Sequence, residues 1–241
     1  MKKITQLVIL ASLSLPVFAQ QKKTVKTVKT TSAVTSPVLK NGIDSFSYAA
    51  GINIAQSMKA QGIENINNAL MQKAMEDVFA NKKLMMDEQQ AGMTLQQKLQ
   101  EFAQKKINAE KVKGAAFLAK NKTRPGVITL PDGLQYEILK EGNGPKPIAT
   151  DTVVVDYAGT LINGAKVDNS FDRGAPVHFV VTQVIKGWTE ALQLMPKGSK
   201  WKVYIPSELG YGDRGNGAVV PGGSTLIFEI ELHDIKPLAK E

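Results

Sequence analysis

Between residues 41 and 121 the apolar residues recur at the spacing of an α-helix, and no proline interrupts the stretch. Two short helices are predicted in its first half. The stripe that indicates the first helix comprises Phe46, Ala49, Ala50, Ile54 and Met58. The stripe that indicates the second helix comprises Ile66, Leu70, Ala74 and Val78. We expect the second helix to stop near Asn81.

A third, longer helix is predicted to begin at Asp87, because Gln90 stands three residues later as the partner of a capping box. Helical propensity continues to about Lys120, and the apolar stripe comprises Leu95, Leu99, Phe102, Ala103 and Ile107. The region could form a small helical domain packed on its neighbour, or a dimer with interlocked helices, and the number of apolar faces favours the dimer. We expect its methionines to fill gaps in that core rather than to present a surface for client chains.

Beyond Pro125 the pattern changes to an alternation with period two, which indicates β-strands. The residues assigned to the inward face are Val153, Val155, Tyr157, Val177, Phe179, Val181, Trp201, Val203, Ile205, Leu226, Phe228, Ile230 and Leu232. One helix, at about 187–195, interrupts the strands. The predicted fold class is therefore α+β. An all-helical N-terminal domain with a long connecting helix (41–121) precedes an antiparallel sheet covered on one face by a short helix (122–241).

The N-terminus has the features of a signal peptide over residues 1–19. Lys2 and Lys3 precede an apolar run, and Val17 and Ala19 occupy the positions where signal peptidase requires small residues. The apolar run is too short for a spanning helix, and no later segment is long and uncharged enough for one. The sequence predicts cleaved export to a bacterial periplasm and no membrane span.

Residues 20–40 repeat Lys, Thr, Val and Ser without an apolar stripe, so we expect a disordered basic leader. The first forty residues contain seven lysines and no acidic residue, and nearly all of the net charge of +8 lies there. The predicted domains are close to neutral, so no basic face indicates a nucleic-acid partner. The absence of cysteine excludes a disulfide framework and a lipoprotein anchor.

Motifs for catalysis or cofactor binding are weak. Gly210–Gly215 reads GYGDRG, which matches a dinucleotide fingerprint, but a strand follows where the pyrophosphate needs a helix N-terminus. His178 and His233, the only histidines, lie on outward strand positions without a carboxylate at ligand spacing. No serine lies in a nucleophile elbow. The sequence therefore predicts no metal, no cofactor and no covalent or acid–base chemistry.

What remains is a group of apolar and aromatic residues around the predicted sheet and the start of its helix. The group comprises Tyr157, Phe179, Val184, Ile185, Trp188, Tyr211, Val219, Val220 and Phe228. Each of them alone fits ordinary core packing as well as a ligand pocket. Asp168 and Arg173 favour a pocket, because charged residues near an apolar face are expected to be paired.

Residues 126–241 resemble the FKBP-type peptidyl-prolyl cis–trans isomerases. The resemblance rests on three ordered blocks, VVVDYAGTLINGAKVDNSFDRG, VIKGWTEALQLMPKGSKWKVYIPSELGYG and VVPGGSTLIFEIEL. Upstream, SYAAGINIAQSMKAQGI and GAAFLAKNKTRPGVITLPDGLQYEIL resemble the helical dimerisation domain and connecting helix of exported bacterial members, of the macrophage infectivity potentiator and FkpA type. The resemblance implies an FKBP-like half-open sheet wrapped on one helix, with a hydrophobic pocket between them. It also implies a homodimer joined by intertwined N-terminal helices.

The resemblance implies a pocket floor formed by Trp188, beneath the prolyl ring of the substrate. Gly187 would allow a tight turn that lays the indole flat. The remaining wall residues would be Tyr157, Phe179, Val184, Ile185 and Phe228, with Val219 and Val220 in the glycine-rich loop.

The resemblance also implies a catalytic set. The Tyr211 hydroxyl and the Ile185 amide would donate hydrogen bonds to a substrate carbonyl. Asp168 would lie beside the substrate amide, held by Tyr157 and Arg173. No proton transfer is implied, which agrees with the missing acid–base residues.

Two positions depart from the family pattern. Phenylalanine usually precedes the aspartate, and here the residue is Val167; a second wall position, often aromatic, is Val177. Both changes should widen the pocket and weaken its hold on the proline ring. We expect reduced isomerase activity or an altered preference for the residue before proline.

Two functions remain open. The first is an enzyme that isomerises X-Pro bonds to assist the folding of exported proteins. The second is a dimeric periplasmic chaperone that holds unfolded chains in its cleft with little or no isomerase activity. The expected partners are proline-containing unfolded or exported polypeptides and a second copy of the chain.

Overall fold

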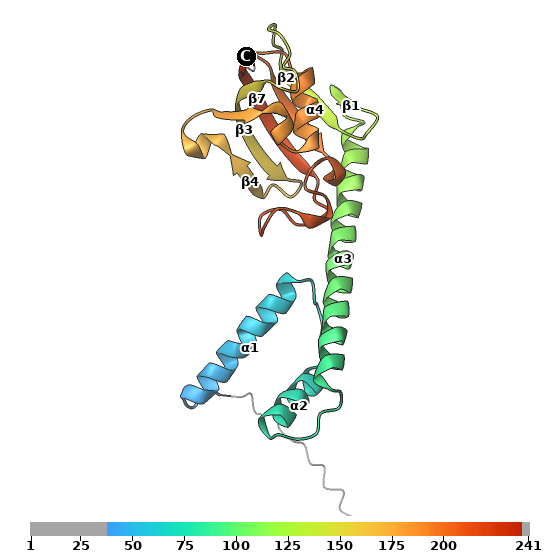
Figure 1. Cartoon of the computed structure of the whole chain (residues 1–241), viewed down its shortest axis with the longest axis vertical. Coiled ribbons are helices and arrows are strands. Elements are labelled where there is room, and N and C mark those ends of the chain that lie inside the picture. Colours follow the sequence, from blue (N-terminus) through green and yellow to red (C-terminus); the bar gives the residue numbers. More distant parts are fainter. Residues whose placement is uncertain (1–37, 238–241) are drawn as a thin grey trace, which may run out of the picture. The chain divides into compact units, whose positions relative to one another are not determined.

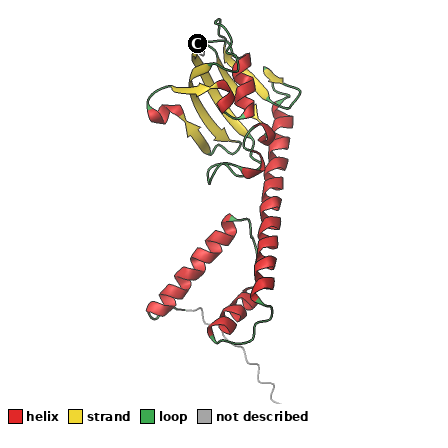
Figure 2. Cartoon of the chain, in the orientation of Figure 1, coloured by secondary structure: helices red, strands yellow, loops and turns green. Residues whose placement is uncertain are grey.

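The computed structural model describes residues 38–237 (Figure 1). The predicted signal peptide (1–19) and all but the last three residues of the predicted leader lie outside the described residues. Three helices, α1 (Gly42–Ala60), α2 (Asn68–Phe79) and α3 (Glu88–Asn121), come first in the chain. Seven strands and a fourth α-helix follow, so the α+β fold class is confirmed (Figure 2). No helix within residues 38–237 is both long and apolar enough to cross a membrane.

Local side-chain chemistry sets the ends of α2 and α3. The Asn67 side chain caps α2 by accepting a hydrogen bond from the Leu70 amide at 3.1 Å. Asp87 and Gln90 form the predicted capping box, in which the Gln90 amide donates to Asp87 Oδ1 at 2.7 Å. Asn81, the predicted stop, lies beyond α2 with a φ of 51°, a left-handed conformation that does not continue a helix.

The apolar stripes of α1 and α2 are largely uncovered by the other residues that the structure describes. No residue of α1 is buried, and α2 buries only Asp77, which is paired with Lys73. The large apolar side chains exposed on these two helices include Ile43, Phe46, Tyr48, Ile52, Ile54, Leu70, Val78 and Phe79. The exposed methionines of the helical region are Met75, Met85, Met86 and Met93. These four methionines pack into no core within the described residues of one chain, so their filling of a core remains a prediction about the dimer.

The seven strands form one antiparallel sheet. The strands are β1 (Val127–Thr129), β2 (Gln135–Lys140), β3 (Thr152–Leu161), β4 (Lys166–Asn169), β5 (Val177–Val180), β6 (Lys200–Ile205) and β7 (Leu226–Lys236). Their order is β1-β2-β6-β7-β3-β4, and β5 pairs with the N-terminal part of β3. Of these, β1, β2 and β4 were not predicted from the alternation, because β1 has only three residues, β4 (KVDN) contains one apolar residue, and β2 is only partly buried.

The inward face of the sheet packs on α4 (Lys186–Leu194) and forms the core. Alternate residues of β3 are buried, from Val153 to Leu161, as the period of two predicts. β7 shows the same alternation from Leu226 to Leu232. The predicted helix at 187–195 is confirmed to within one residue at each end.

The C-terminal end of α3 covers part of the opposite face of the sheet. The Phe117 ring lies 6.0 Å from the ring of Tyr204, which is buried although its strand position points outward. The Asn121 side-chain amide donates to Gln135 Oε1 at 2.9 Å, and the Gln135 amide donates to the Leu118 carbonyl at 3.0 Å. These buried polar contacts join α3 to β2 and β6.

Candidate active site

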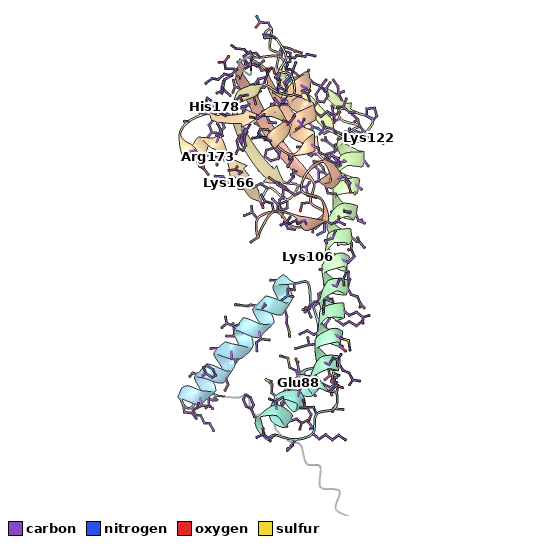
Figure 3. The ribbon with its side chains drawn as sticks, viewed as in Figure 1. Glu88, Lys106, Lys122, Lys166, Arg173 and His178 are labelled. Carbon is purple, nitrogen blue, oxygen red and sulfur yellow. The ribbon has the colours of Figure 1, made fainter. Side chains whose placement is uncertain are left out.

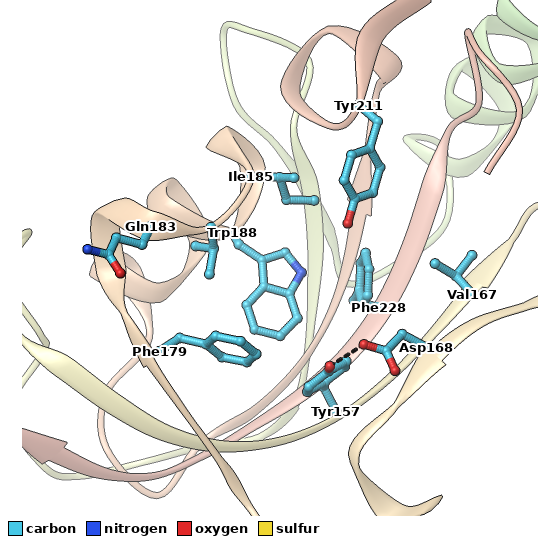
Figure 4. Close-up of a pocket in the computed structure, with 10 residues that line it drawn as sticks. Tyr157, Val167, Asp168, Phe179, Gln183, Ile185, Trp188, Tyr211 and Phe228 are labelled. Atoms are coloured by element: carbon cyan, nitrogen blue, oxygen red, sulfur yellow. Dashed lines mark hydrogen bonds between the residues drawn. The ribbon is translucent and has the colours of Figure 1, made fainter. Parts of the chain in front are cut away.

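A cavity of about 390 Å³ opens between the inward face of the sheet and the start of α4 (Figure 4). It is lined by Tyr157, Val167, Asp168, Phe179, Gln183, Val184, Ile185, Trp188, Tyr211 and Phe228. The volume suits a small ligand or one or two residues of a peptide, and the lining is mostly aromatic and aliphatic. All of these residues except Gln183 were singled out from the sequence.

Trp188 contributes its indole to the cavity, and three rings surround it at nearly right angles. The centroid distances are 5.1 Å to Tyr157, 5.2 Å to Phe228 and 5.7 Å to Phe179. Rings at this separation and angle attract each other edge to face. The indole Nε1 has no hydrogen-bond partner in the part of the chain that the structure describes, so ring packing alone orients it.

Gly187 brings α4 close to the sheet. The tight turn expected from the sequence is wrong, because Gly187 is the second residue of α4 and does not have a positive φ. A Cβ at this position would lie 2.6 Å from Cγ2 of Ile205 on β6. Glycine therefore permits a close approach of helix to strand, and this approach sets the depth of Trp188.

Tyr157, Asp168 and Arg173 form a closed hydrogen-bond network beside the cavity. The Tyr157 hydroxyl donates to Asp168 Oδ2 and accepts from Arg173 Nη2. Arg173 Nη1 donates to Asp168 Oδ1 at 2.9 Å, and the Asn169 amide donates to the same oxygen at 2.8 Å. The guanidinium carbon lies 5.5 Å from the Tyr157 ring centroid. The network fixes the carboxylate on the cavity wall, while Arg173 itself does not line the cavity.

The network also determines protonation. Burial and the hydrogen bond to Asp168 raise the pKa of Tyr157 to about 12. Burial also tends to raise the pKa of Asp168. The hydrogen bonds from Arg173, Tyr157 and Asn169 outweigh burial and hold the pKa of that carboxyl below its usual value. At neutral pH the site therefore holds a phenol and a carboxylate, and neither group is poised for proton transfer.

Tyr211 and Ile185 supply candidate donors from two different elements. Tyr211 belongs to the loop of residues 206–225 between β6 and β7, and its hydroxyl points into the cavity from the side opposite Tyr157 (Figure 4). Ile185 directly precedes α4, and its carbonyl accepts from the amides of Trp188 and Thr189 at 2.9 and 3.1 Å. The start of the helix therefore holds Ile185 rigidly at the cavity wall.

Four residues of the predicted site do not line the cavity: Arg173, Val177, Val219 and Val220. Val219 is exposed, and Val220 is 2% exposed and belongs to the core. Gln183, in contrast, lines the cavity although it was not singled out, because a short 3₁₀ turn (Val181–Gln183) places it at the rim. Its only signal in the sequence is its position directly before Val184.

The histidines lie away from the cavity. His178 is exposed on β5 (Figure 3), and His233 Nε2 lies 2.8 Å from Asp156 Oδ2 on the outward face. Within residues 38–237, no group of three or more potential ligand side chains converges on one point. Among the described residues, the polar groups at the cavity are the phenols, the carboxylate, the Gln183 amide, the Trp188 indole N–H and backbone amides.

The described residues thus form an antiparallel sheet packed on one short helix, with a mostly apolar cavity between them that is large enough for a small ligand group. Family comparison identifies the class of protein. Residues 144–233 match the model of the FKBP-type peptidyl-prolyl cis-trans isomerase, and residues 43–138 match the domain amino-terminal to it. The chain belongs to the FKBP-type peptidyl-prolyl cis–trans isomerase family.

Similar proteins cover most of the chain. An outer membrane protein MIP of Legionella longbeachae is 44% identical over 204 residues, which are 81% of this chain and 87% of that protein. The FkpA isomerase of Aeromonas hydrophila is 42% identical over 207 residues, covering 80% of this chain and 76% of that protein. The crystal structure of FkpA from Escherichia coli matches with a TM-score of 0.64 at 36% identity and covers 83% of this chain and 99% of that one.

Proposed function

We propose that this isomerase catalyses rotation about X-Pro bonds of exported polypeptides by a non-covalent mechanism in the cavity beside Trp188. The observation that carries the proposal is the cavity itself. It combines an indole held by three perpendicular rings, a phenol directed inward and a fixed carboxylate. The proposal requires space for a substrate beside Trp188. A cavity of about 390 Å³ lined by this residue supports it.

The chemistry requires no proton transfer. Rotation about a peptide bond passes a barrier of about 18–20 kcal/mol because amide resonance is lost. The planar amide is more dipolar than the twisted one, so water stabilises the ground state more than the transition state. An apolar cavity removes that advantage and binds the twisted form better. Each tenfold acceleration requires about 1.4 kcal/mol of such differential binding.

Individual roles follow from position. Trp188 forms the surface on which the prolyl ring rests, and Phe179, Phe228 and Val184 enclose it. The Tyr211 hydroxyl and the Ile185 amide donate to substrate carbonyls on either side of the proline. Val167, Val219 and Val220 contribute apolar surface near the entrance or behind it.

The carboxylate has a separate role. Asp168, held by Tyr157 and Arg173, presents a fixed negative charge to the rotating amide. Such a charge interacts differently with the planar and the twisted amide, because their dipoles differ.

A protease-free isomerisation assay on proline-containing peptides tests the proposal with the full chain. We expect Trp188→Ala to reduce kcat/KM by at least about tenfold, because the ring contacts contribute on the order of 1–2 kcal/mol. Tyr211→Phe should reduce it by about threefold to tenfold through the loss of one hydrogen bond. Tyr48→Phe, an exposed tyrosine on α1, is the matched control. Equal turnover in all four proteins would overturn the proposed site.

We propose further that the chain forms a homodimer through its N-terminal helices and acts in the periplasm after removal of residues 1–19. The dimer is supported by the uncovered apolar side chains of α1 and α2, since a second copy would bury them. The match of residues 43–138 to the amino-terminal domain of the family supports the same assignment. Periplasmic export rests on the sequence pattern of the N-terminus.

Chaperone activity is the second candidate function, favoured by the exposed methionines and aromatic residues of the helical region. Suppression of aggregation of an unfolded, proline-free client would separate it from isomerisation. If Trp188→Ala retains full suppression while its turnover is lost, the two activities reside in different regions. If suppression is absent in the wild-type chain, the chaperone candidate fails and the isomerase stands alone.

A further inference from the structure

One face of the C-terminal half of α3 lies against the loop of residues 206–225, the Tyr211 loop. Ile107, Lys111 and Gly114 are four and three residues apart, so they share that face of the helix. At Gly114 the side chain of Thr225 occupies the space where a Cβ would stand. The helix and the loop that carries a proposed catalytic hydroxyl are therefore in direct contact.

The loop backbone approaches the helix backbone most closely at Ile107. A Cβ at Gly223 would lie 2.6 Å from the Ile107 carbonyl oxygen, and a Cβ at Gly222 would lie 3.1 Å from Ile107 Cγ1. Gly223 also has a φ of +80°, which other residues rarely adopt. Because these two residues are glycines, α3 can lie closer to the loop than a side chain at either position would allow.

Lys111 adds a charged link to the segment that contains Tyr211. Its Nζ lies 2.5 Å from Asp213 Oδ1 and 3.7 Å from Glu208 Oε1. The hydrogen bond to Asp213 raises the pKa of Lys111, which is consistent with a formed ion pair. Glu208 and Asp213 lie in the two 3₁₀ turns on either side of Tyr211, so one ammonium group ties both turns to the helix.

Hydrogen bonds within the loop extend this anchor to Tyr211 itself. The Gly215 amide donates to the Tyr211 carbonyl at 3.2 Å, and the Gly223 amide donates to the Gly212 carbonyl at 2.9 Å. The Tyr211 backbone thus lies between the turn that Lys111 binds and the loop segment Gly222–Gly223, which packs on Ile107. Gly212 and Gly215 on the same turn have φ values of 58° and 66°, which residues other than glycine rarely adopt.

We propose that Lys111 of α3 is a positioning residue for the isomerase reaction, which holds the Tyr211 hydroxyl in place through Asp213 and Glu208. The inference rests on the proposed function of Tyr211 as a donor to substrate. It makes the long helix a functional part of the active site, in addition to being a connection between domains. A hydroxyl that is free to move contributes less to the transition state than one that is held.

The first test compares Lys111→Met with Lys113→Met in the full chain. Methionine keeps the length and packing of the lysine stem but removes the charge. Among the described residues, the Lys113 ammonium pairs with Glu110 on the same helix, at 2.7 Å, and with no acidic group of the loop, so it is a matched control. For a partly exposed ion pair we expect Lys111→Met to lower kcat by about twofold to fivefold with KM unchanged. Lys113→Met should match the wild-type chain, and Lys111→Arg should restore most of the lost turnover.

The second test asks whether Lys111 acts through Tyr211. In a Tyr211→Phe background there is no hydroxyl to hold, so adding Lys111→Met should have no further effect on kcat. If the effect of Lys111→Met is as large in that background as in the wild-type chain, Lys111 acts by another route and the inference is overturned. An unchanged kcat in the Lys111→Met variant alone would also overturn the inference. Turnover by the wild-type chain in the same assay would leave the proposed function intact.

Hydrogen exchange gives a readout that is independent of turnover. We expect Lys111→Met to accelerate exchange of the amides of Gly215 and Gly223, and Lys113→Met to leave them unchanged. Hydrogen exchange tests whether Lys111 restrains the loop even if the wild-type chain is inactive towards peptides. Inactivity of the wild-type chain would contradict the proposed function and not the loop contact. Identical exchange in residues 206–225 of both variants and the wild-type chain would show that Lys111 does not hold the loop.

Discussion

The size of the Val167 side chain determines how wide the cavity is beside Asp168. Val167 lines the cavity on β4, beside Asp168 (Figure 4). Valine fills less of this wall than an aromatic ring would. If a prolyl ring binds as proposed, we expect more room for the residue before it and fewer contacts to the ring.

Restoring an aromatic ring at this position should increase turnover. We expect Val167→Phe to raise kcat/KM by about threefold to tenfold, since additional buried apolar area of a few tens of Å² contributes on the order of 1 kcal/mol. The gain should be larger for peptides with a small residue before proline than for those with a bulky one. Kinetics on a peptide series measures both effects, and unchanged turnover across the series would show that the smaller wall carries no cost.

The Tyr157–Asp168 pair predicts a flat pH profile. The lowered pKa of Asp168 keeps it ionised above about pH 4, and the raised pKa of Tyr157, about 12, keeps it protonated below that value. The Asp168 contribution to stability is lost only as the pH falls through its depressed pKa, and the Tyr157 contribution only as the pH rises above about 10. With a peptide that has no titrating group, kcat/KM should be constant from about pH 5 to about pH 9. A rise or fall of tenfold within this window would show that a titrating group takes part.

Among the structural elements, α4 depends on one close contact for its position. Gly187→Ala would place a methyl group against Ile205, and overpacking of this kind costs about 1–3 kcal/mol. We expect a lower melting temperature of the isomerase domain and, because Trp188 follows directly, a lower kcat/KM. Gly92→Ala on α3 is the matched control, since no atom lies within 4 Å of its Cβ position, and it should stabilise its helix slightly. Equal melting of Gly187→Ala and wild type would mean that α4 is free to shift.

A second contact of α4 makes stability depend on pH. Burial, together with the hydrogen bond and charge of Asp132 in the turn between β1 and β2, raises the pKa of Glu190 to about 7. A raised pKa favours folding below the unfolded value near 4.5, and that contribution is lost as the pH rises to about 7. We therefore expect Glu190→Gln to melt a few degrees above wild type at pH 8 and within about 1 °C of it at pH 5. Glu64→Gln in the loop after α1 is the control, and equal differences at both pH values would contradict the assignment.

At the scale of the whole molecule, the proposed homodimer depends on the helical region. Leu70 and Val78 lie on one face of α2 and are 54% and 59% exposed in the chain. Replacing both with glutamate should produce a monomer by light scattering, because charge cannot be buried in the interface. Turnover of a short peptide should change by less than about twofold, since neither residue is near the cavity. Lys82→Glu carries the same change in charge outside the stripe, and a dimer in the double variant would place the interface elsewhere.

The pattern of the chain was sufficient for the elements whose causes are local. The alternation of β3 and β7, the capping box at Asp87 and the stop at Asn81 each depend on residues within a few positions of one another. The aromatic group around Trp188 could also be found, because consistently apolar strand positions must share one face. The strands β1 and β4 could not, because three residues do not define a period and the sequence KVDN contains one apolar residue.

The pattern of apolar and polar positions could not predict contacts between residues that are far apart in the sequence. The buried Tyr204 beneath Phe117, the clash that Gly187 avoids with Ile205, and the link from Lys111 to Asp213 all join positions that are 18 to 102 residues apart. Local periodicity decides which face of a helix or strand is apolar, and the residues that share a cavity wall can be proposed from it. Which residue of one element meets which residue of another depends on register and packing, and these arise only when the elements are assembled.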